Sequence, residues 1–457
     1  MQNQDHYKWY AFMGVALLSF GCYLDYTVVN VALPTIQQEF HVSLVQLQWV
    51  MNIYFLALCI LATLMGRCGD LYGRRRVFYL GVAVFAMASL IAGLSPNIHY
   101  LIFGRFLQGV GAAMVFPLGP SLLPEAFPEH ERGKVIGWLG SVGGIALASG
   151  PVLGGVIVTH LGWRWIFFIN IPVVLLGCLF AFKSLKESVS NTVNRELDCR
   201  GMFLLTLTIG GFVMSLIHSQ TAGWANSVTL LYLLIAIIMG IVLVKVERHQ
   251  SNPLIDFKDF SNLMFYSGAV LCLLAGVLSA VALFFDPLYL QVTRGQSPET
   301  SGLILFAIPV TVFLVAFSIG KLIHRFGIIH TIILGFVLAI VSCFLQAWFT
   351  DSISFGYIII SFVCLGGMWA IGNTVPIIAA QTAVGSARSS LATGAMVTMF
   401  NIGGAIGLAL SVVIYNFIGT RALTDIFMHG FSGVMWFLFI ISIALLLSVL
   451  IFKSRSS

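Results

Sequence analysis

Charged side chains are scarce in this chain of 457 residues, since Asp, Glu, Lys and Arg together make up only 9% of it. A soluble domain carries about 25% charged residues, which cover the surface that faces water. Apolar residues make up 59% of the chain instead, and its mean hydropathy is +0.99. This composition therefore excludes an ordinary soluble globular protein.

Closely spaced cysteines are missing as well. The eight cysteines form no C-x-x-C pair and lie mostly inside apolar blocks. Metal sites and disulfide frameworks need cysteines at short, regular spacings. We therefore predict that these cysteines are small packing residues, and we expect neither a metal ion nor another cofactor.

Motifs of enzymes and ATP-driven proteins are also missing. The sequence has no G-x-x-x-x-G-K-[ST], no H-E-x-x-H and no G-x-S-x-G. Their absence argues against direct coupling to ATP, and against an intramembrane protease or lipid hydrolase. We therefore expect a protein that is not an enzyme.

Long apolar blocks are abundant. A helix needs roughly 17 to 25 apolar residues to cross a bilayer core of about 30 Å, and only helices and closed barrels satisfy their backbone there. The blocks are too long for barrel strands, so the sequence predicts an all-α integral membrane protein with about fourteen transmembrane helices. The expected spans lie near 10–33, 48–66, 77–95, 99–123, 135–159, 164–183, 202–219, 229–246, 263–289, 301–322, 329–349, 354–380, 391–417 and 432–452.

Basic residues predict the orientation of these helices. With fourteen spans, nineteen of the 23 lysines and arginines fall on the side that carries both termini. Only Arg164, Arg294 and Arg421 fall on the other side, and Arg105 lies within a span. Cytoplasmic loops are enriched in Lys and Arg, so we expect both termini in the cytoplasm, below the cell (inner) membrane. This bias also explains the net charge of +6 without a nucleic-acid partner.

A short internal sequence repeat suggests that the chain has two related halves. Gly66-x6-Gly73 after the second span recurs as Gly320-x6-Gly327 after the tenth. Parallel repeats in transporters form two bundles with a substrate path between them. We therefore predict a six-helix bundle over 1–183, a linker with two additional transmembrane helices over 184–260, and a second six-helix bundle over 261–457.

The loop that holds the first copy of this repeat contains an acidic residue and several basic residues. Asp70 and the run Arg74, Arg75 and Arg76 lie between Gly66 and the third span. A turn with positive-inside charge explains the arginines, but not an aspartate among glycines. The loop resembles that of the major facilitator superfamily, matched here at Gly66, Asp70, Gly73, Arg74 and Arg75. Cys68 and Leu71 depart from it, and His324 replaces the acid in the second copy. The resemblance implies a cytoplasmic gate.

Arg105 in the fourth span is the next candidate. A charge inside lipid costs a few kcal/mol, so an arginine there faces a cavity or a partner, or else extends to the interface. The string from Leu101 through Arg105 and Gln108 to Gly109 and Gly111 resembles the fourth-span motif of the same superfamily. That resemblance implies a role for Arg105 in proton transfer.

The fifth span carries small residues at regular spacing. They are Gly137, Ala146, Gly150, Pro151, Gly154 and Gly155. In lipid such a face packs closely against another helix, and the proline bends its own helix. The spacing also resembles the motif that marks exporters within the superfamily, with Ala146 in place of a glycine.

Asp25 in the first span is the candidate proton carrier. It lies about fifteen residues beyond Tyr10, roughly 22 Å along the helix and past the midplane. Burial there favours the protonated acid, which suits a proton carrier, although a structural hydrogen bond is the alternative. Together with Gln48-Trp49, Tyr54 and the string 162–172, this stretch resembles the fourteen-span drug:proton antiporter branch of the superfamily.

Several polar and aromatic residues are candidates for a substrate cavity. They are Tyr26, Asn30, Trp49, Tyr54, Gln108, Asn373 and Asn401. Asp286, late in the ninth span, is a second and weaker acidic candidate, because solvation near the outer interface would account for it.

The resemblance implies a monomeric, proton-coupled antiporter that exports amphipathic or cationic organic compounds by alternating access, with Asp25 and Arg105 coupling the proton. A dedicated exporter of one metabolite or siderophore on the same fold is the nearest alternative. A receptor or scaffold and a lipid-modifying membrane enzyme are the others. The missing soluble domain and catalytic motifs argue against these two.

Overall fold

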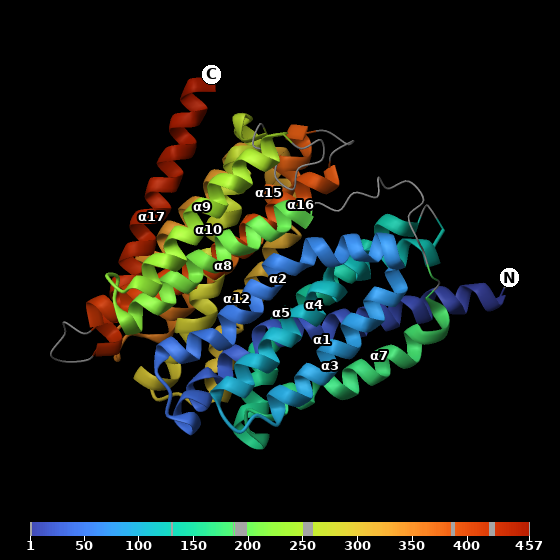
Figure 1. Ribbon diagram of the computed structural model, residues 1–457, viewed down its shortest axis with the longest axis horizontal. Helices are drawn as coiled ribbons and strands as arrows, with labels where there is room; N and C mark the ends of the chain where they lie inside the picture. The colour runs from blue at the N-terminus through green and yellow to red at the C-terminus, as the bar shows by residue number, and fades with distance from the viewer. Residues whose placement is uncertain are drawn as a thin grey trace. The chain divides into compact units, whose positions relative to one another are not determined.

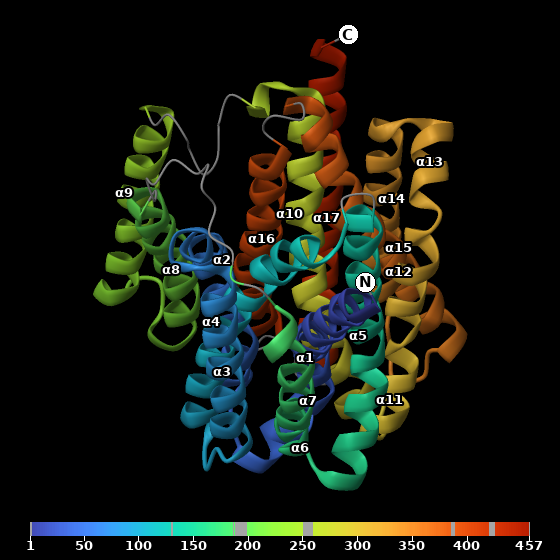
Figure 2. The same cartoon turned by 90° about the vertical axis from the view of Figure 1, so that its right-hand side faces the viewer.

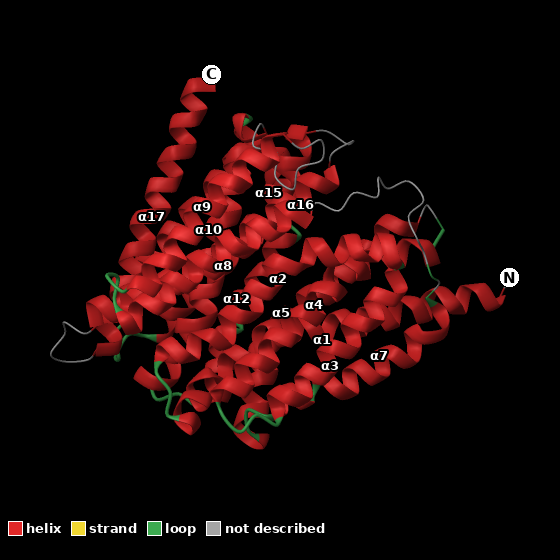
Figure 3. Ribbon diagram, in the orientation of Figure 1, coloured by secondary structure: helices red, strands yellow, loops and turns green. Residues whose placement is uncertain are grey.

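The computed structural model describes residues 2–128, 131–185, 187, 199–249, 259–384, 389–419 and 426–456. Helices account for nearly all of this part of the chain, and its short connections contain no strand (Figures 1 and 3). The prediction of an all-α protein is therefore confirmed.

The structure divides into two compact units. Unit 1 comprises Met1–Leu197 together with Gln296–Phe306, a short segment from much later in the sequence. Its helices are α1 (Gln2–Phe40), α2 (Leu44–Tyr72), α3 (Arg74–Gly93), α4 (Ile98–Ala126), α5 (Arg132–Leu161), α6 (Trp165–Phe168), α7 (Asn170–Ser184) and α11 (Pro298–Leu305).

Unit 2 comprises Asp198–Gly295 and Ala307–Ser457. Its helices are α8 (Cys199–Ala222), α9 (Ser227–His249), η2 (Asp259–Ser261), α10 (Leu263–Leu288), the π-helix η3 (Tyr289–Thr293), α12 (Ala307–Ala316), α13 (Ile319–Phe326), α14 (Ile328–Ala347), α15 (Phe355–Val384), α16 (Ser389–Gly419) and α17 (Ile426–Ser456). The helices α8 and α9 pack side by side as a pair (Figure 2), and α8 also contacts α16.

The two units repeat one order of helix pairing. In unit 1 α1 packs against α4, α5 and α7, and α3 packs against α4. In unit 2 α10 packs against α15, α16 and α17, and α14 packs against α15. This repeat makes α10 the counterpart of α1, and α15 the counterpart of α4. The finer prediction of bundles over 1–183 and 261–457, with a linker over 184–260, stays a prediction.

Eleven helices of the described residues are long and apolar enough to cross a membrane. Three shorter apolar helices, Leu44–Leu58, Ile145–Leu161 and Phe203–Ser219, lie within α2, α5 and α8. Proline and glycine are tolerated in such helices because neighbouring helices compensate for lost backbone bonds. Pro34, Pro151 and Pro376 accordingly lie inside α1, α5 and α15.

The helix starts follow local signals in the sequence. Ser43 and Gln46 form a capping box at the start of α2, and Asn97 accepts two backbone N–H bonds at the start of α4. Such caps satisfy the free N–H groups of the first turn. Gly73 and Gly327, the second glycines of the two repeated loops, are the N-cap residues of α3 and α14, with φ of 108° and 80°. The sequence repeat therefore corresponds to a shared backbone conformation that favours glycine.

Candidate functional site

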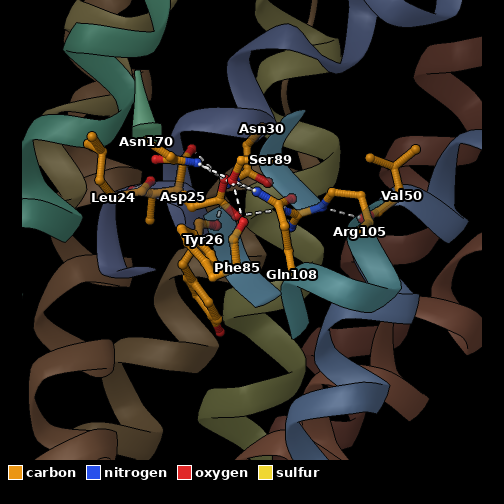
Figure 4. Close-up of polar contacts among 11 residues, drawn as sticks. Leu24, Asp25, Tyr26, Asn30, Val50, Phe85, Ser89, Arg105, Gln108 and Asn170 are labelled. Carbon is orange, nitrogen blue, oxygen red and sulfur yellow. Dashed lines mark hydrogen bonds and ion pairs between the residues drawn. The ribbon is translucent and has the colours of Figure 1, made fainter. Parts of the chain in front are cut away.

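Asp25 of α1 and Arg105 of α4 form an ion pair in the interior of unit 1 (Figure 4). Arg105 Nη1 donates to Asp25 Oδ2 at 2.5 Å, and both side chains are 0% exposed. Arg105 therefore does not extend to a membrane interface, and the alternative of an interfacial arginine is wrong. Removing a charge pair from water is costly unless further hydrogen bonds satisfy it.

Two amides supply those bonds to Asp25. Oδ1 accepts from Gln108 Nε2 at 3.0 Å and from Asn170 Nδ2 at 2.9 Å. Both amides also reach the hydroxyl of Ser89, at 2.9 and 3.3 Å, and Ser89 donates its proton to the Phe85 carbonyl (Figure 4). These donors satisfy the oxygen atoms of a carboxylate that lies in the protein interior.

The guanidinium of Arg105 is fixed on three sides. Its Nε donates to the Val50 carbonyl at 3.1 Å, and its Nη1 also donates to Gln108 Oε1 at 2.9 Å. The ring of Tyr54 lies 4.3 Å from the guanidinium carbon, which is the geometry of a cation–π contact. Among the described residues Nη2 has no hydrogen-bond partner. Five helices, α1, α2, α3, α4 and α7, thus contribute to one buried polar cluster.

Two glycines of α4, Gly109 and Gly111, allow α2 and α3 to approach α4 closely. A Cβ on Gly109 would lie 2.7 Å from Ala57 Cβ and 3.0 Å from the Tyr54 carbonyl, both on α2. A Cβ on Gly111 would lie 2.7 Å from the Gly81 carbonyl and the Phe85 nitrogen, both on α3. The glycines of the fourth-span motif therefore position Arg105 and Gln108 by allowing close packing against α2 and α3.

The loop between α2 and α3 is fixed by a residue that the sequence analysis did not identify. Glu187, just beyond α7, accepts the backbone N–H of Arg75 at 3.0 Å, and lies 3.7 Å from Arg76 Nε. The guanidinium of Arg75 donates to the Phe182 carbonyl at 2.8 Å. A Cβ on Gly73 would lie 2.6 Å from Glu187 Oε1. Glu187 therefore caps α3, whose N-terminus attracts negative charge.

The remaining residues of the predicted gate lie around this cap. Gly66 and Gly69 pack against Pro117 and Leu118 of α4, and Arg74 is the first residue of α3. Asp70 belongs to the last turns of α2, but its side chain lies outside the described part of the structure.

The small residues of α5 contact two different helices. Gly150 and Gly154 face α1, where a Cβ on Gly150 would overlap Thr27 Oγ1, and a Cβ on Gly154 would lie 2.8 Å from the Val28 carbonyl. Gly155 faces α11, where its Cβ would lie 2.5 Å from the Pro298 carbonyl. The predicted close packing of this motif is therefore confirmed at Gly150, Gly154 and Gly155.

The other three residues of the motif, Pro151, Ala146 and Gly137, also lie in α5. A Cβ on Gly302 of α11 would overlap the Pro151 carbonyl, so Pro151 belongs to the contact with α11. Ala146 is completely buried. Gly137 lies in α5, but beyond its backbone this position is outside the described part of the structure.

Residues 162–172, the string that follows α5, contact the end of α1 and the cluster around Asp25. Trp163 Nε1 and Arg164 Nη1 each donate to the carboxylate of Glu39 at 2.6 Å, and so fix the end of α1. Arg164 also donates to the Ser95 carbonyl at 3.3 Å. Seven residues beyond Trp163, Asn170 begins α7 and reaches Asp25.

The sequence pattern of the Major Facilitator Superfamily matches residues 15–197 and 199–408, which together form most of the chain. The chain belongs to the major facilitator superfamily. The predicted resemblance to this superfamily is therefore confirmed, whereas membership of its fourteen-span branch stays a prediction.

Three relatives within this superfamily are named for resistance or transport. The multidrug resistance protein Stp of Mycobacterium tuberculosis is 32% identical over 396 residues, covering 86% of this chain and 73% of Stp. The tetracenomycin C resistance and export protein of Streptomyces glaucescens is 31% identical over 405 residues, covering 88% and 75%. The riboflavin transporter RibZ of Clostridioides difficile is 30% identical over 321 residues, covering 70% and 69%. The chain is therefore a multi-pass membrane transporter of small molecules.

The predicted cavity residues of this superfamily member fall into two groups. Tyr26, Tyr54 and Gln108 lie at or beside the Asp25 cluster, and Trp49 is half-buried on α2. Three amides bond to their own helices instead: Asn30 donates to the Thr27 carbonyl at 2.9 Å, Asn373 to that of Trp369 at 3.0 Å, and Asn401 to that of Val397 at 3.0 Å. Their role in substrate binding stays a prediction.

The sequence analysis gave no individual role to several residues that lie at this site. Ser89, Asn170 and Glu187 hold the predicted residues in place, as described above. Gln48 and Asn52, one turn apart on α2, are completely buried, and within the described residues their amide atoms have no hydrogen-bond partner. Buried amides normally have a hydrogen-bond partner in the protein or in ordered water. The signal for them was polar residues at i and i+4 within an apolar span.

Proposed function

We propose that this transporter is a proton-coupled antiporter that exports amphipathic or cationic organic compounds by alternating access. The observation that supports it best is the Asp25–Arg105 pair, a carboxylate that can gain a proton beside a fixed positive charge inside a membrane-spanning unit. The names of Stp and of the tetracenomycin C protein support resistance and export.

The cluster around Asp25 has two alternative charge states. When Asp25 is ionised, Arg105 and the amides of Gln108 and Asn170 compensate it. When a proton from water joins Oδ1 or Oδ2, the ion pair is lost and the charge of Arg105 remains inside the protein. This change of charge shifts the equilibrium between two conformations of the unit. In our proposal substrate binds when the proton leaves Asp25, and protonated Asp25 favours the return of the empty transporter.

The loop after α2 is the proposed cytoplasmic gate. Glu187 holds Arg75 and Arg76 at the start of α3, so this loop is tied to the end of α7. In our proposal Asp70 works with these arginines to close the cytoplasmic side. If Asp70→Asn left the transport rate unchanged, the assignment of the gate would be wrong.

The proposed topology has fourteen spans, both termini in the cytoplasm and a monomeric protein in the inner membrane. Single cysteines in a cysteine-free background test it. A membrane-impermeant maleimide should label Ser227→Cys, at the start of α9, in intact cells. It should label Ser454→Cys, near the end of α17, only in inverted vesicles. Labelling of both from one side would contradict the seven spans that the topology places between them.

Proton release from inverted vesicles tests the coupling. Vesicles with an acidic interior receive ethidium or a similar cationic dye, and the loss of the pH gradient is recorded. The wild type should release protons, whereas Asp25→Asn should not. Asp351→Asn, an exposed aspartate outside the cluster, is the matched control and should behave like the wild type. Equal release from wild type and Asp25→Asn would refute Asp25 as the proton carrier.

A dedicated exporter of one metabolite or siderophore is the second candidate. The names of two relatives, with tetracenomycin C and riboflavin, each give a single compound. Competition separates the two candidates, because a multidrug pump shows mutual inhibition among unrelated cations. A dedicated exporter would respond only to its own substrate and close analogues.

A further inference from the structure

Asp286 is a second buried carboxylate, and it lies in unit 2. It is 0% exposed near the end of α10. Neither of its carboxylate oxygens has a hydrogen-bond partner among the described residues. The expectation that water at the outer interface solvates Asp286 is therefore wrong. An ionised carboxylate in this position would have lost its hydration without gaining any compensation.

The part of α10 that carries Asp286 is buried and rich in apolar and aromatic residues. α10 is the central helix of its unit, packed by α14, α15, α16 and α17, and its residues from Ala280 to Leu288 are all buried. Phe285 contacts the rings of Tyr415 and Phe431. Tyr289 donates its hydroxyl proton to the Thr350 carbonyl at 2.7 Å, so this proton is not available to Asp286.

Among the described residues, the titratable groups on the packed elements that are in electrostatic range of Asp286 carry no positive charge. On the side of α10 that carries Asp286 the titratable groups are Tyr289 on η3, Cys343 on α14, Tyr357 on α15, Tyr415 on α16 and the exposed His429 on α17. Of these, Tyr289 and Cys343 are in electrostatic range of Asp286, and neither can be a cation. Arg294, eight residues further on, donates to the Asp351 carbonyl and covers the Phe355 ring.

The repeat between the units also bears on the missing partner of Asp286 among the described residues. α10 is the counterpart of α1, which carries Asp25, and α15 is the counterpart of α4, which carries Arg105. The whole of α15, Phe355–Val384, contains no charged residue. Unit 2 thus has an acid on the helix equivalent to α1, whereas α15, the helix equivalent to α4, carries no cation.

We propose that Asp286 is a second proton-binding site of this transporter, which carries its proton as a neutral acid while it is buried as in this structure. The proton comes from water, and it returns to water when a conformational change hydrates this end of α10. The inference extends the proposed function, because it places a site for a proton in each unit.

Infrared spectroscopy tests this protonation state directly. The purified protein is reconstituted in lipid at neutral pH, and the C=O stretch of a protonated carboxylic acid is recorded in H2O and D2O. Wild type should show a band that shifts in D2O, and Asp286→Asn should lack it. Asp25→Asn should keep the band, because Asp25 is ion-paired. A wild type without the band, or a band that persists in Asp286→Asn, would refute the proposal.

A second variant, Asp286→Glu, keeps the test possible if Asp286→Asn does not fold. Asp286→Asn replaces a neutral acid by a neutral amide of nearly the same shape, so a single symmetric peak in size-exclusion chromatography is expected. If this variant aggregates, Asp286→Glu replaces it in the comparison. Its acid should give a carboxylic band at a frequency different from that of wild type, and an unchanged band would refute the proposal.

The infrared result does not depend on transport. If wild-type vesicles release no protons on dye addition but the Asp286 band is present, the proposed antiport fails and the proton site stands. If vesicles release protons through Asp25 and the Asp286 band is absent, the antiport stands and the inference fails.

Discussion

Asp25 in unit 1 and Asp286 in unit 2 lie on equivalent helices and are equally inaccessible to water. Asp25 has an arginine, two amides and a nearby hydroxyl around it, whereas Asp286 has no hydrogen bond among the described residues. In our proposal two ways of burying a carboxylate are thereby combined in one molecule: one is paired with an arginine and two amides, and the other keeps its proton.

The frameworks around the two aspartates differ much less. In unit 1, Gly150 on α5 meets Thr27 of α1 so closely that a Cβ would overlap it. In unit 2, a Cβ on Gly276 of α10 would overlap the Phe400 carbonyl of α16, and a Cβ on Gly403 would overlap the Leu273 carbonyl. The repeated fold therefore conserves close helix packing through glycine, while the chemistry at the buried acid differs between the units.

The largest effect is expected when the ion pair loses one member. Arg105→Gln leaves Asp25 buried without a cation, which should lower the free energy of unfolding by about 3–5 kcal/mol, and Asp25→Asn should cost a similar amount. The double variant should cost much less than the sum of the two, because both act on one interaction. Additive losses, measured by unfolding in mixed micelles, would show that the two residues act independently.

A smaller effect is expected where the glycines bring helices together. Gly150→Ala and Gly276→Ala should each lower the free energy of unfolding by about 1–3 kcal/mol, since the added methyl group overpacks a tight contact. Gly394→Ala on α16, which has no atom within 4 Å of an added Cβ, is the control and should be neutral. A loss in only one of the two units would mean that their frameworks are less alike than the structure indicates.

Alanine substitutions at Gly73 and Gly327 should lower stability by different amounts. Alanine in the left-handed region costs about 1–2 kcal/mol at either Gly73 or Gly327. Gly73→Ala should cost more, because its Cβ would also press on Glu187, whereas an added Cβ at Gly327 meets nothing within 4 Å. Thermal unfolding of the two variants in detergent checks this order, and equal losses would argue against Glu187 as a structural cap.

The smallest effect is expected at Asp286. Asp286→Asn removes no hydrogen bond described in the structure, and exchanges one neutral group for another, so the free energy of unfolding should change by less than about 1 kcal/mol. The same substitution at Asp25 should have a severalfold larger effect. A large loss at Asp286, measured in the same micelles, would show that the carboxylate has a partner after all.

The positions of Asp25 and Arg105 could be predicted because charge within an apolar span is costly and therefore conspicuous. That they pair could not be read from the sequence, since they lie 80 residues apart on different helices. Ser89 had no distinctive signal, because serines in spans, such as Ser184, commonly bond to their own backbone. Asn170 was part of a recognised string, but only the structure shows that it reaches Asp25.

The surroundings of Glu187 and Asp286 were harder to predict. Glu187 lies in a polar stretch where its carboxylate had many possible partners, although the nearby arginine-rich loop could have suggested one. Asp286 precedes a proline at the end of a predicted span, a place that suggests solvation at the interface. Its burial depends on α10 being surrounded by four helices and continuing into η3, which is tertiary information.

The distance along the chain between Asp25 and Arg105 also has a consequence for biogenesis. A chain is made from its N-terminus, so α1 must enter the membrane before α4 exists. Until then Asp25 is a solitary acid, at a cost of about 2.5–3.5 kcal/mol near the centre of a span. Asp25→Asn should therefore lengthen the lifetime of a fragment ending at residue 97 and shorten that of one ending at residue 128, as a pulse-chase measurement can show. The arrival of Arg105 then marks the point in synthesis at which the first helices become committed to one another.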